Sequence, residues 1–212
     1  MIQSKRDLKF YIAADRIMNG FPERKSLKEI LVNWIDRPVS GLILRYLRAM
    51  RYYSYYKNTV KRKFSTKMLL MLVWHRRWNK MSLKLGYSIG PNSLGYGVVL
   101  PHHGTIVVNE NAQIGNFSVL HTSTCIAGGE KQIGDFFYMS SGSQVVGSLV
   151  LGDNVSVAAH SLVNKSFGDN VLLVGTPADV KKKDYQAWYI RDGEKYMERV
   201  NRVLKLKKEI YG

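Results

Sequence analysis

The stretch IGNFSVLHTSTCI, residues 114–126, opens a six-residue repeat that decides the fold. Its apolar residues Ile114, Leu120 and Ile126 stand six positions apart, and an α-helix, which repeats every 3.6 residues, does not keep this period. After one seven-residue step the period continues through Ile133, Met139, Val145, Leu151, Val157 and Val163. An ordinary β-sandwich with fortuitous spacing is the alternative, and six successive matches without a slip argue against it.

A short repeat of this kind indicates a solenoid, in which each unit buries its apolar face only by stacking on its neighbours. We interpret each hexad as one short strand and one turn, with the apolar residue pointing inward. Three hexads form a triangular coil of about eighteen residues, so the stretch 87–175 holds roughly five coils. Glycine at the second place of a hexad, as at Gly115 and Gly134, is expected to tolerate the backbone angles of the turn.

Three short motifs carry a resemblance to a known family. They are LPHHGTIVVN at residues 100–109, AQIG at 112–115 and GTPA at 175–178. The chain resembles the hexapeptide-repeat acetyltransferases, in particular the branch of serine acetyltransferase-like and polysaccharide O-acetyltransferase proteins, over about its last 60%. The resemblance implies a mainly β fold with some α, namely a left-handed parallel β-helix preceded by a small helical region and followed by a C-terminal helix.

The chain divides into three parts: a basic helical region at 1–85, the β-helix domain at 86–178 and a basic helical tail at 179–212. Within the first part, the segment 26–35 is a predicted helix with Ser26 as its N-cap and Glu29 three residues later. Further helices are predicted at 39–56 and 65–84, and an amphipathic one at 185–211. The run 68–74 is apolar all round, so it should be buried or lie on a membrane surface.

Charge and cysteine content limit the classes of function. Residues 1–85 carry 20 Lys and Arg against 5 acids, whereas residues 86–175 carry 2 against 5. The single cysteine, Cys125, leaves no internal disulfide framework and is interpreted as an ordinary thiol of a reducing compartment. Because the sequence shows neither a signal region nor a long apolar run, we expect a cytoplasmic protein. The surplus of cations in residues 1–85 leaves peripheral contact at the inner membrane face open.

The basic helical region has two interpretations. The favoured one is a collar that covers the open end of the first coil. The other is a contact with an anionic membrane surface, suggested by tyrosines interleaved with arginine and lysine at 52–57. Charge alone does not choose between lipid, nucleic acid and a phosphorylated substrate.

His102 is the candidate catalytic residue. Acetyl transfer from a thioester to a hydroxyl needs a base near neutral pH, and imidazole has a suitable pKa. In the resembled family, the histidine before the Gly-Thr-Ile-Val-Val type of run is that base, and His102 occupies its place. Asn109 and Glu110 are the nearest polar candidates to orient it, and His103 is the substitute base. His121, eighteen residues after His103, would stack on it, but no third ligand appears, so no metal is expected.

The resemblance also implies acetyl-CoA as co-substrate, bound along a groove between subunits of a homotrimer. Small residues in the turns would let the ligand approach the backbone. The candidate acetyl-CoA residues are Ser141, Gly142, Ala159, Gly175, Pro177, Lys181 and Lys182. The two lysines are expected to reach a phosphate of the ligand.

Two departures from the serine acetyltransferase pattern bear on the acceptor. Pro101 stands where that family has an aspartate before the histidine, and the loop at 127–132 lacks the family's Arg-His pair. A serine carboxylate would then lose its bidentate partner, with Lys131 as the one remaining cation. We therefore expect O-acetylation of a sugar in capsule, O-antigen or other surface-polysaccharide synthesis, on a nucleotide- or lipid-linked glycan and with no nucleic-acid partner.

Two alternatives stay open. The first is serine O-acetyltransfer for cysteine synthesis. The second belongs to another class: a protein that binds an anionic surface or nucleic acid through residues 1–85 and carries a noncatalytic β-helix.

Overall fold

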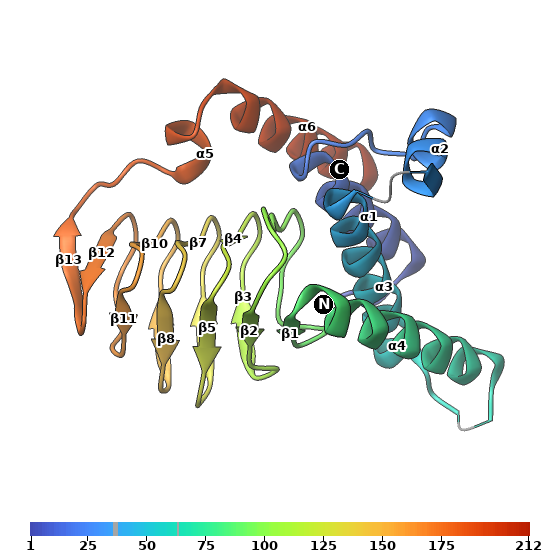
Figure 1. The fold of residues 1–212 in the computed structure, drawn as a ribbon, viewed down its shortest axis with the longest axis horizontal. Coiled ribbons are helices and arrows are strands. Elements are labelled where there is room, and N and C mark those ends of the chain that lie inside the picture. Colours follow the sequence, from blue (N-terminus) through green and yellow to red (C-terminus); the bar gives the residue numbers. More distant parts are fainter. Residues whose placement is uncertain (36–37, 63) are drawn as a thin grey trace.

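The computed structural model describes residues 1–35, 38–62 and 64–212 and shows a prism of stacked coils with helices at one end (Figure 1). Its first face consists of β1 (Tyr87–Ile89), β2 (Ile106–Val108), β5 (Thr124–Ala127), β8 (Gln144–Val146) and β11 (Leu162–Val163). The second consists of β4 (Val119–Leu120), β7 (Tyr138–Met139), β10 (Ser156–Val157), β12 (Leu172–Gly175) and β13 (Ala178–Lys182). The third consists of β3 (Ala112–Ile114), β6 (Lys131–Ile133) and β9 (Leu149–Leu151). Neighbouring strands pair in parallel, except that β13 turns back antiparallel on β12. The predicted parallel β-helix of about five coils is confirmed.

The core of the prism is the six-residue row found in the sequence. Every member of the row is at most 5% exposed: Ile114, Leu120, Ile126, Ile133, Met139, Val145, Leu151, Val157 and Val163. The fifth-place residues point inward as well, since Ser118, Ser143 and Val155 are all 0% exposed. Each coil therefore rests on the one before it through one continuous apolar column.

The second-place glycines serve a purpose other than the one expected. Gly115 and Gly134 do not have positive φ, and the left-handed turn positions hold residues such as Phe117, Phe136 and Asn154 instead. A Cβ on Gly115 would lie 2.5 Å from the carbonyl carbon of Gly134 in the next coil. The glycines are thus needed for close approach between coils.

That close approach allows a ladder of side-chain hydrogen bonds along one edge. The backbone N–H of Asn116 donates to Asp135 Oδ1 at 2.7 Å, and the N–H of Asp135 donates to Asp153 Oδ1 at 2.7 Å. The N–H of Asp153 in turn donates to Asp169 Oδ1 at 2.8 Å. Each aspartate satisfies a turn N–H of the preceding coil, which the parallel strands alone would leave unpaired.

Four helices precede the β-helix: α1 (Lys5–Met18), α2 (Leu27–Ile35), α3 (Val39–Thr59) and α4 (Thr66–Leu85). The sequence predicted the last three, and the Ser26 hydroxyl accepts the Glu29 N–H at 3.1 Å as expected of an N-cap. The predicted end of α2 at Asp36 and Arg37, and the side chain of Trp34 on its apolar face, lie outside the described residues. The sequence analysis missed α1, although Ser4 and Asp7 form a capping box at its start.

The apolar run of α4 is not buried, contrary to the first of the two expectations. Leu69 is 64% exposed and Leu72 is 49% exposed, so this part of the helix is not buried in the chain. The helix extends away from the β-helix (Figure 1), although its Trp74 ring stacks on Tyr52 of α3 at 4.1 Å. Among the described residues, no helix is long and apolar enough to cross a membrane.

Helices α1 and α3 cover the open end of the first coil. Tyr46, Leu47 and Met50 of α3 are buried in the same apolar cluster as Tyr87 and Leu100 of the coil. At the centre of this contact Arg51 and Asp15 form an ion pair at 2.8 Å, with their side chains 1% and 3% exposed. Arg51 also donates to the carbonyl of Leu94 at 2.7 Å, and Asp15 accepts the N–H of Gly97 at 2.9 Å. The pair therefore bonds two helices to one turn of the β-helix.

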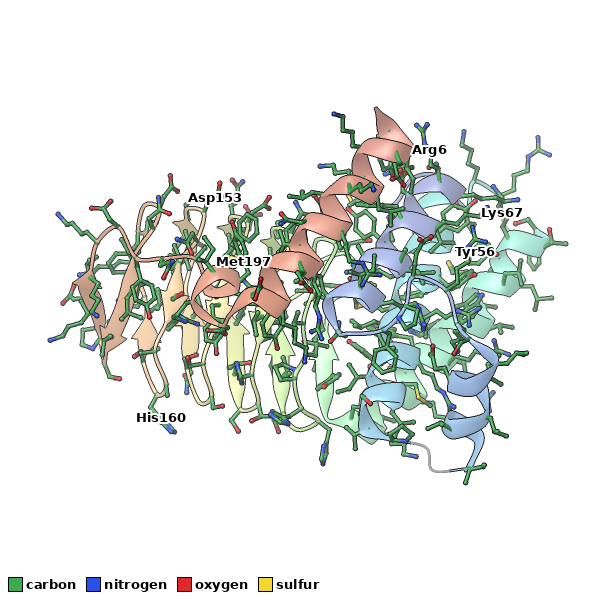
Figure 2. The ribbon with its side chains drawn as sticks, turned by 90° about the horizontal axis from the view of Figure 1, so that it is seen from above. Arg6, Tyr56, Lys67, Asp153, His160 and Met197 are labelled. Atoms are coloured by element: carbon green, nitrogen blue, oxygen red, sulfur yellow. The ribbon has the colours of Figure 1, made fainter. Side chains whose placement is uncertain are left out.

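The C-terminal segment returns to the helical end of the molecule. The predicted helix at 185–211 is divided into α5 (Trp188–Arg191) and α6 (Glu194–Tyr211), because Gly193 between them has φ 104°. From above, α6, which carries Met197, runs from the β-helix towards α1 (Figure 2). At its end, Tyr211 donates its hydroxyl to Asp7 Oδ1 at 2.7 Å. The segment thus links the second face of the β-helix to α1.

Replacing Asp15 tests the buried ion pair. In Asp15→Asn the Arg51 guanidinium stays buried without a carboxylate, so we expect the free energy of unfolding to fall by about 3–5 kcal/mol in a denaturant titration. The matched control is Asp179→Asn, which breaks the surface ion pair between Asp179 and Lys165. The side chain of Lys165 is 56% exposed and that of Asp179 is 72% exposed. This substitution should cost less than about 1 kcal/mol. Equal losses in the two variants would contradict a structural role for Asp15.

Candidate active site

His102 lies in the turn that leads from the second face of the β-helix to the first. The coil pairing places Val99 beside Val119 and Ile106 beside Thr124, so this turn is two residues longer than the turn below it. The His102 side chain is exposed. Its backbone carbonyl accepts the hydroxyl of Tyr87 at 2.6 Å. Tyr87, which the sequence analysis did not single out, therefore fixes the backbone that carries the candidate base.

Five turns of the described chain, beginning with the His102 turn, lie below one another along this edge of the prism. Backbone hydrogen bonds connect them: the N–H of Ser123 donates to the Thr105 carbonyl at 2.6 Å, that of Gly142 to Thr122 at 3.2 Å, and that of His160 to Ser141 at 3.1 Å. The Thr176 hydroxyl then donates to the His160 carbonyl at 3.2 Å. Four steps of about 4.8 Å make the edge roughly 19 Å long from the His102 turn to the turn of Thr176.

Most of the residues proposed to bind acetyl-CoA lie on this edge. Ser141, Gly142 and Ala159 stand in two of its turns, and Gly175 and Pro177 flank Thr176 at its end. His160 packs against Gly142, since a Cβ on Gly142 would lie 2.6 Å from His160 Nδ1. His160 projects from this edge into solvent in the view from above (Figure 2). The edge therefore consists of small residues, and the imidazole of His160 lies across them.

Lys181 and Lys182 do not belong to this edge. In the pairing of β12 with β13, Gly175 faces Ala178 at the edge, whereas Lys182 faces Leu172 at the other end of the strands. Lys182 lies four residue steps along the strand from Ala178, which corresponds to about 13 Å. The sequence pattern gave no sign of the antiparallel return, so the two lysines were expected nearer to the edge than they are.

Asn109 and Glu110 are not brought to His102 either. They follow β2 at the edge between the first and third faces, whereas His102 precedes β2. Asn109 Oδ1 accepts the N–H of Asn111 at 3.0 Å. Glu110 lies near Tyr53 of α3, whose pKa is raised by burial and then by the Glu110 charge. Within residues 1–35, 38–62 and 64–212, nothing hydrogen-bonds to the His102 imidazole.

His121 is the ionisable group that the fold places beside His102. Burial lowers the pKa of His121, and the positive charge of His102 lowers it further. Its Nε2 is 2.9 Å from the hydroxyl of Tyr138. The sequence analysis paired His121 with His103 by the spacing of eighteen, but the longer upper turn brings it into electrostatic contact with His102 instead.

The C-terminal segment supplies charged groups to the same place. The carboxylate of Asp192 and the guanidinium of Arg191 both act on the pKa of His121, the first raising and the second lowering it. Arg191 lies 4.7 Å over the ring of Tyr138 and is 2.8 Å from Asp192 Oδ1. The α5 helix is held here by Trp188, which is 1% exposed and donates Nε1–H to the Phe117 carbonyl at 2.9 Å.

The exposed imidazole of His102 therefore has a cluster of polar side chains on one side and an edge of small residues below it. The cluster consists of His121, Tyr138, Arg191 and Asp192. In the part of the chain that the structure describes, no cluster of three or more His, Cys, Asp or Glu is arranged to hold a metal ion. This arrangement can support proton transfer between the imidazole and a group bound beside it.

An NMR pH titration tests the contact between the two imidazoles. His121 should titrate below the ordinary value of 6.5. In His102→Ala its pKa should rise, because a neighbouring positive charge has been removed. His75→Ala, which removes an imidazole 5.8 Å from the Trp78 ring within α4, is the control and should leave the pKa of His121 unchanged. If His121 titrates identically with and without His102, the two rings are not neighbours.

No protein-family model matches the sequence. The chain is 27% identical over 106 residues to a serine acetyltransferase of Synechococcus elongatus, a match that covers 46% of this chain and 43% of that protein. It is 26% identical over 107 residues to a serine acetyltransferase of Staphylococcus xylosus, with 47% and 50% covered. The matches therefore span about half the length of these curated relatives.

Solved structures extend the likeness to most of the chain at the level of the fold. The serine acetyltransferase of Neisseria gonorrhoeae has a TM-score of 0.59 and 22% identity, over 86% of this chain and 67% of that one. A serine acetyltransferase solved in complex with CoA has a TM-score of 0.55 and 19% identity, with 80% and 68% covered. The chain thus carries a hexapeptide-repeat β-helix related to that of the serine acetyltransferases.

Proposed function

We propose that this protein is an acetyl-CoA-dependent O-acetyltransferase in which His102 is the general base. The observation that supports it most directly is the position of His102: an exposed imidazole at the head of an edge of small residues about 19 Å long. The curated relatives, named as serine acetyltransferases, favour the same reaction class. His102 is exposed, so packing of the core does not require a histidine at this turn.

In the proposed reaction His102 takes the proton of the acceptor hydroxyl while the oxygen attacks the thioester carbonyl. The tetrahedral intermediate collapses by breaking the carbon–sulfur bond, and the proton passes from His102 to the leaving thiolate. No covalent enzyme intermediate is needed, because both substrates meet at one base. Burial and the nearby His102 lower the pKa of His121, which favours its neutral form and reduces repulsion of the imidazolium that forms.

The small-residue edge suits the extended arm of acetyl-CoA, which supplies the acetyl thioester. The turns at Ser141, Gly142 and Ala159 carry small residues, which lets a ligand come close to the backbone groups beside them. His160 crosses the same edge and would lie against the bound arm. Since Lys181 and Lys182 stand about 10 and 13 Å along β13 from the edge, we propose no phosphate contact for them at this site.

A sugar hydroxyl is the acceptor that the site favours over free serine. In the loop at 127–132, the one cation left for a carboxylate was Lys131. Its side chain is folded inward: the residue is 1% exposed, and Nζ donates to the carbonyls of Ala127, at 2.8 Å, and Gly128. A buried ammonium that bonds to its own loop does not bind a substrate carboxylate. We therefore propose a glycan acceptor for surface-polysaccharide synthesis.

Serine remains the second candidate because the curated relatives carry that name. Arg191 gives it one specific support, since its guanidinium is close enough to His121 to affect its pKa. It is, however, already bonded to Asp192 and to the Tyr185 hydroxyl, at 2.8 and 3.1 Å. A carboxylate would have to displace one of these partners.

We also propose a homotrimer, because the His102 edge is open and a neighbouring subunit would close it into a groove. A cytoplasmic location with contact at the inner membrane face is proposed from the surplus of cations in residues 1–85, 20 against 5 acids. The apolar side chains that α4 exposes, such as Leu69, favour a lipid surface over nucleic acid as the anionic partner.

Replacing His102 tests the mechanism. In His102→Ala, kcat for acetyl transfer should fall by about 10²–10⁴-fold, the range of general-base catalysis. Release of CoA thiol from acetyl-CoA in the presence of acceptor measures it. His103→Ala is the matched control, because it alters the same turn, and its kcat should stay within a few-fold of wild type. A full rate in His102→Ala would rule out the proposed base.

A panel of acceptors tests the substrate. With acetyl-CoA as donor, nucleotide sugars and lipid-linked glycans should be acetylated with higher kcat/KM than serine. The reason is that Lys131, the cation of the 127–132 loop, donates its ammonium to carbonyls of that loop. Acetylation of serine alone would contradict the glycan proposal and leave the mechanism intact.

A further inference from the structure

A cavity of about 630 Å³ lies in the helical N-terminal region, away from the His102 edge. It is enclosed by α1, α3 and the segment that leads into α2, and its volume falls in the range of small-molecule binding sites. Its floor is apolar and consists of Ile12, Ala13, Leu44 and Leu47. Neither the collar role of these helices nor the proposed reaction accounts for a cavity of this size.

The wall of the cavity is strongly basic. Among the described residues that line it, the cations are Lys9, Arg16, Arg24, Lys25, Arg45 and Arg48. The carboxylates are Asp15, Glu23 and Glu29, of which Asp15 is bonded to Arg51 and Glu29 to Arg16 at 2.6 Å. Most of the negative charge at the wall is therefore already engaged, and the cavity keeps a surplus of positive charge.

The pKa of Lys25 indicates that several of these cations lie close together. Its pKa is lowered first by burial and then by Arg48, with Arg16 and Arg45 adding to the effect and Glu29 opposing it. Like charges repel at short range, and a protein gains nothing in stability from gathering them. A bound anion between Lys25 and Arg48 would remove this repulsion.

Exposed apolar residues lie beside the basic wall. Helix α2 begins two residues after Lys25 and exposes Leu27, Ile30 and Leu31, which are 86%, 52% and 56% accessible. Large aliphatic residues gathered on one short helix indicate a surface that meets a partner. An inorganic anion would use the cations alone, whereas a lipid phosphate would use the cations, the apolar floor and this helix.

We propose that the cavity binds the phosphate monoester headgroup of a membrane lipid, with Lys25 and Arg48 contacting the phosphate and α2 lying among the acyl chains. A phosphate monoester carries up to two negative charges, so it suits several converging cations better than a singly charged diester. The inference rests on the proposed membrane contact and makes it specific. It is independent of acetyl transfer, because binding is measured without turnover.

The test uses the full-length chain and vesicles. Phosphatidylcholine vesicles that contain phosphatidic acid offer a phosphate monoester, and vesicles with phosphatidylglycerol at equal surface charge offer only a diester. Wild type should prefer the first on the order of tenfold, as one or two charge-assisted hydrogen bonds would give. Co-sedimentation measures both affinities, and their ratio cancels the general attraction of a basic protein to an anionic surface.

Two double variants with equal loss of charge decide the site. Lys25→Gln with Arg48→Gln should abolish the preference. Lys57→Gln with Lys61→Gln, which removes exposed cations further along α3 and just after it, should keep it. Melting temperatures check that all four substitutions leave the fold intact.

Several results would overturn the proposal: no preference in wild type, equal loss in the two double variants, or binding of inorganic pyrophosphate with no binding to vesicles. The last result would assign the cavity to a soluble anion. Ile30→Ser should weaken binding to phosphatidic acid vesicles without affecting the binding of soluble pyrophosphate. An unchanged affinity for vesicles would remove α2 from the membrane contact. Acetyl transfer by His102 would stand or fall separately from each of these outcomes.

Discussion

Each coil of the prism can bury its inward side chain only against the coils before and after it. This constraint produces the six-residue period, since every third hexad must return to the same face at the spacing of paired strands. It also requires glycine where Gly115 and Gly134 pass within contact of each other's backbone. The turns are thereby stacked at fixed height, and the edge that carries His102, Ser141 and Ala159 follows from that stacking.

The first coil has no predecessor, and the helices α1 and α3 take that place. Their contact combines an apolar cluster around Tyr46 and Leu100 with the Asp15–Arg51 pair, whose bonds satisfy backbone groups of the first coil. A buried ion pair of this kind contributes more to fixing a single geometry than to stability, because both charges lose their hydration when the pair forms. The same docking leaves a basic cavity between the helices, so the region that closes the solenoid also presents a surface of its own.

The β-helix and three of the N-terminal helices were predictable from the sequence, because the hexad row and the 3.6-residue pattern are local signals that burial enforces. The site was predictable only in part. His102 and the small-residue turns follow from the repeat and the family resemblance, but Asn109 and Glu110, close in sequence, lie beyond β2 at another edge.

The neighbours that the structure gives to His102 come from distant parts of the chain. Tyr87 lies one coil away, and Arg191 and Asp192, whose charges act on the adjacent His121, arrive through the C-terminal segment held by Trp188. No sequence spacing encodes where such a segment docks. Likewise, the antiparallel return of β13 moved Lys181 and Lys182 away from the edge, because a strand that reverses direction has no signature in the hexad count.

The central claim is that one imidazole and one row of small turns form a single acetyl-transfer site. A crystal structure of the protein with CoA tests it most directly. The account predicts the thiol within hydrogen-bonding reach of the His102 imidazole, about 3 Å or through one water, with the pantetheine arm along the turns of Ser141 and Ala159. CoA bound at another edge, or a thiol remote from His102, would contradict it.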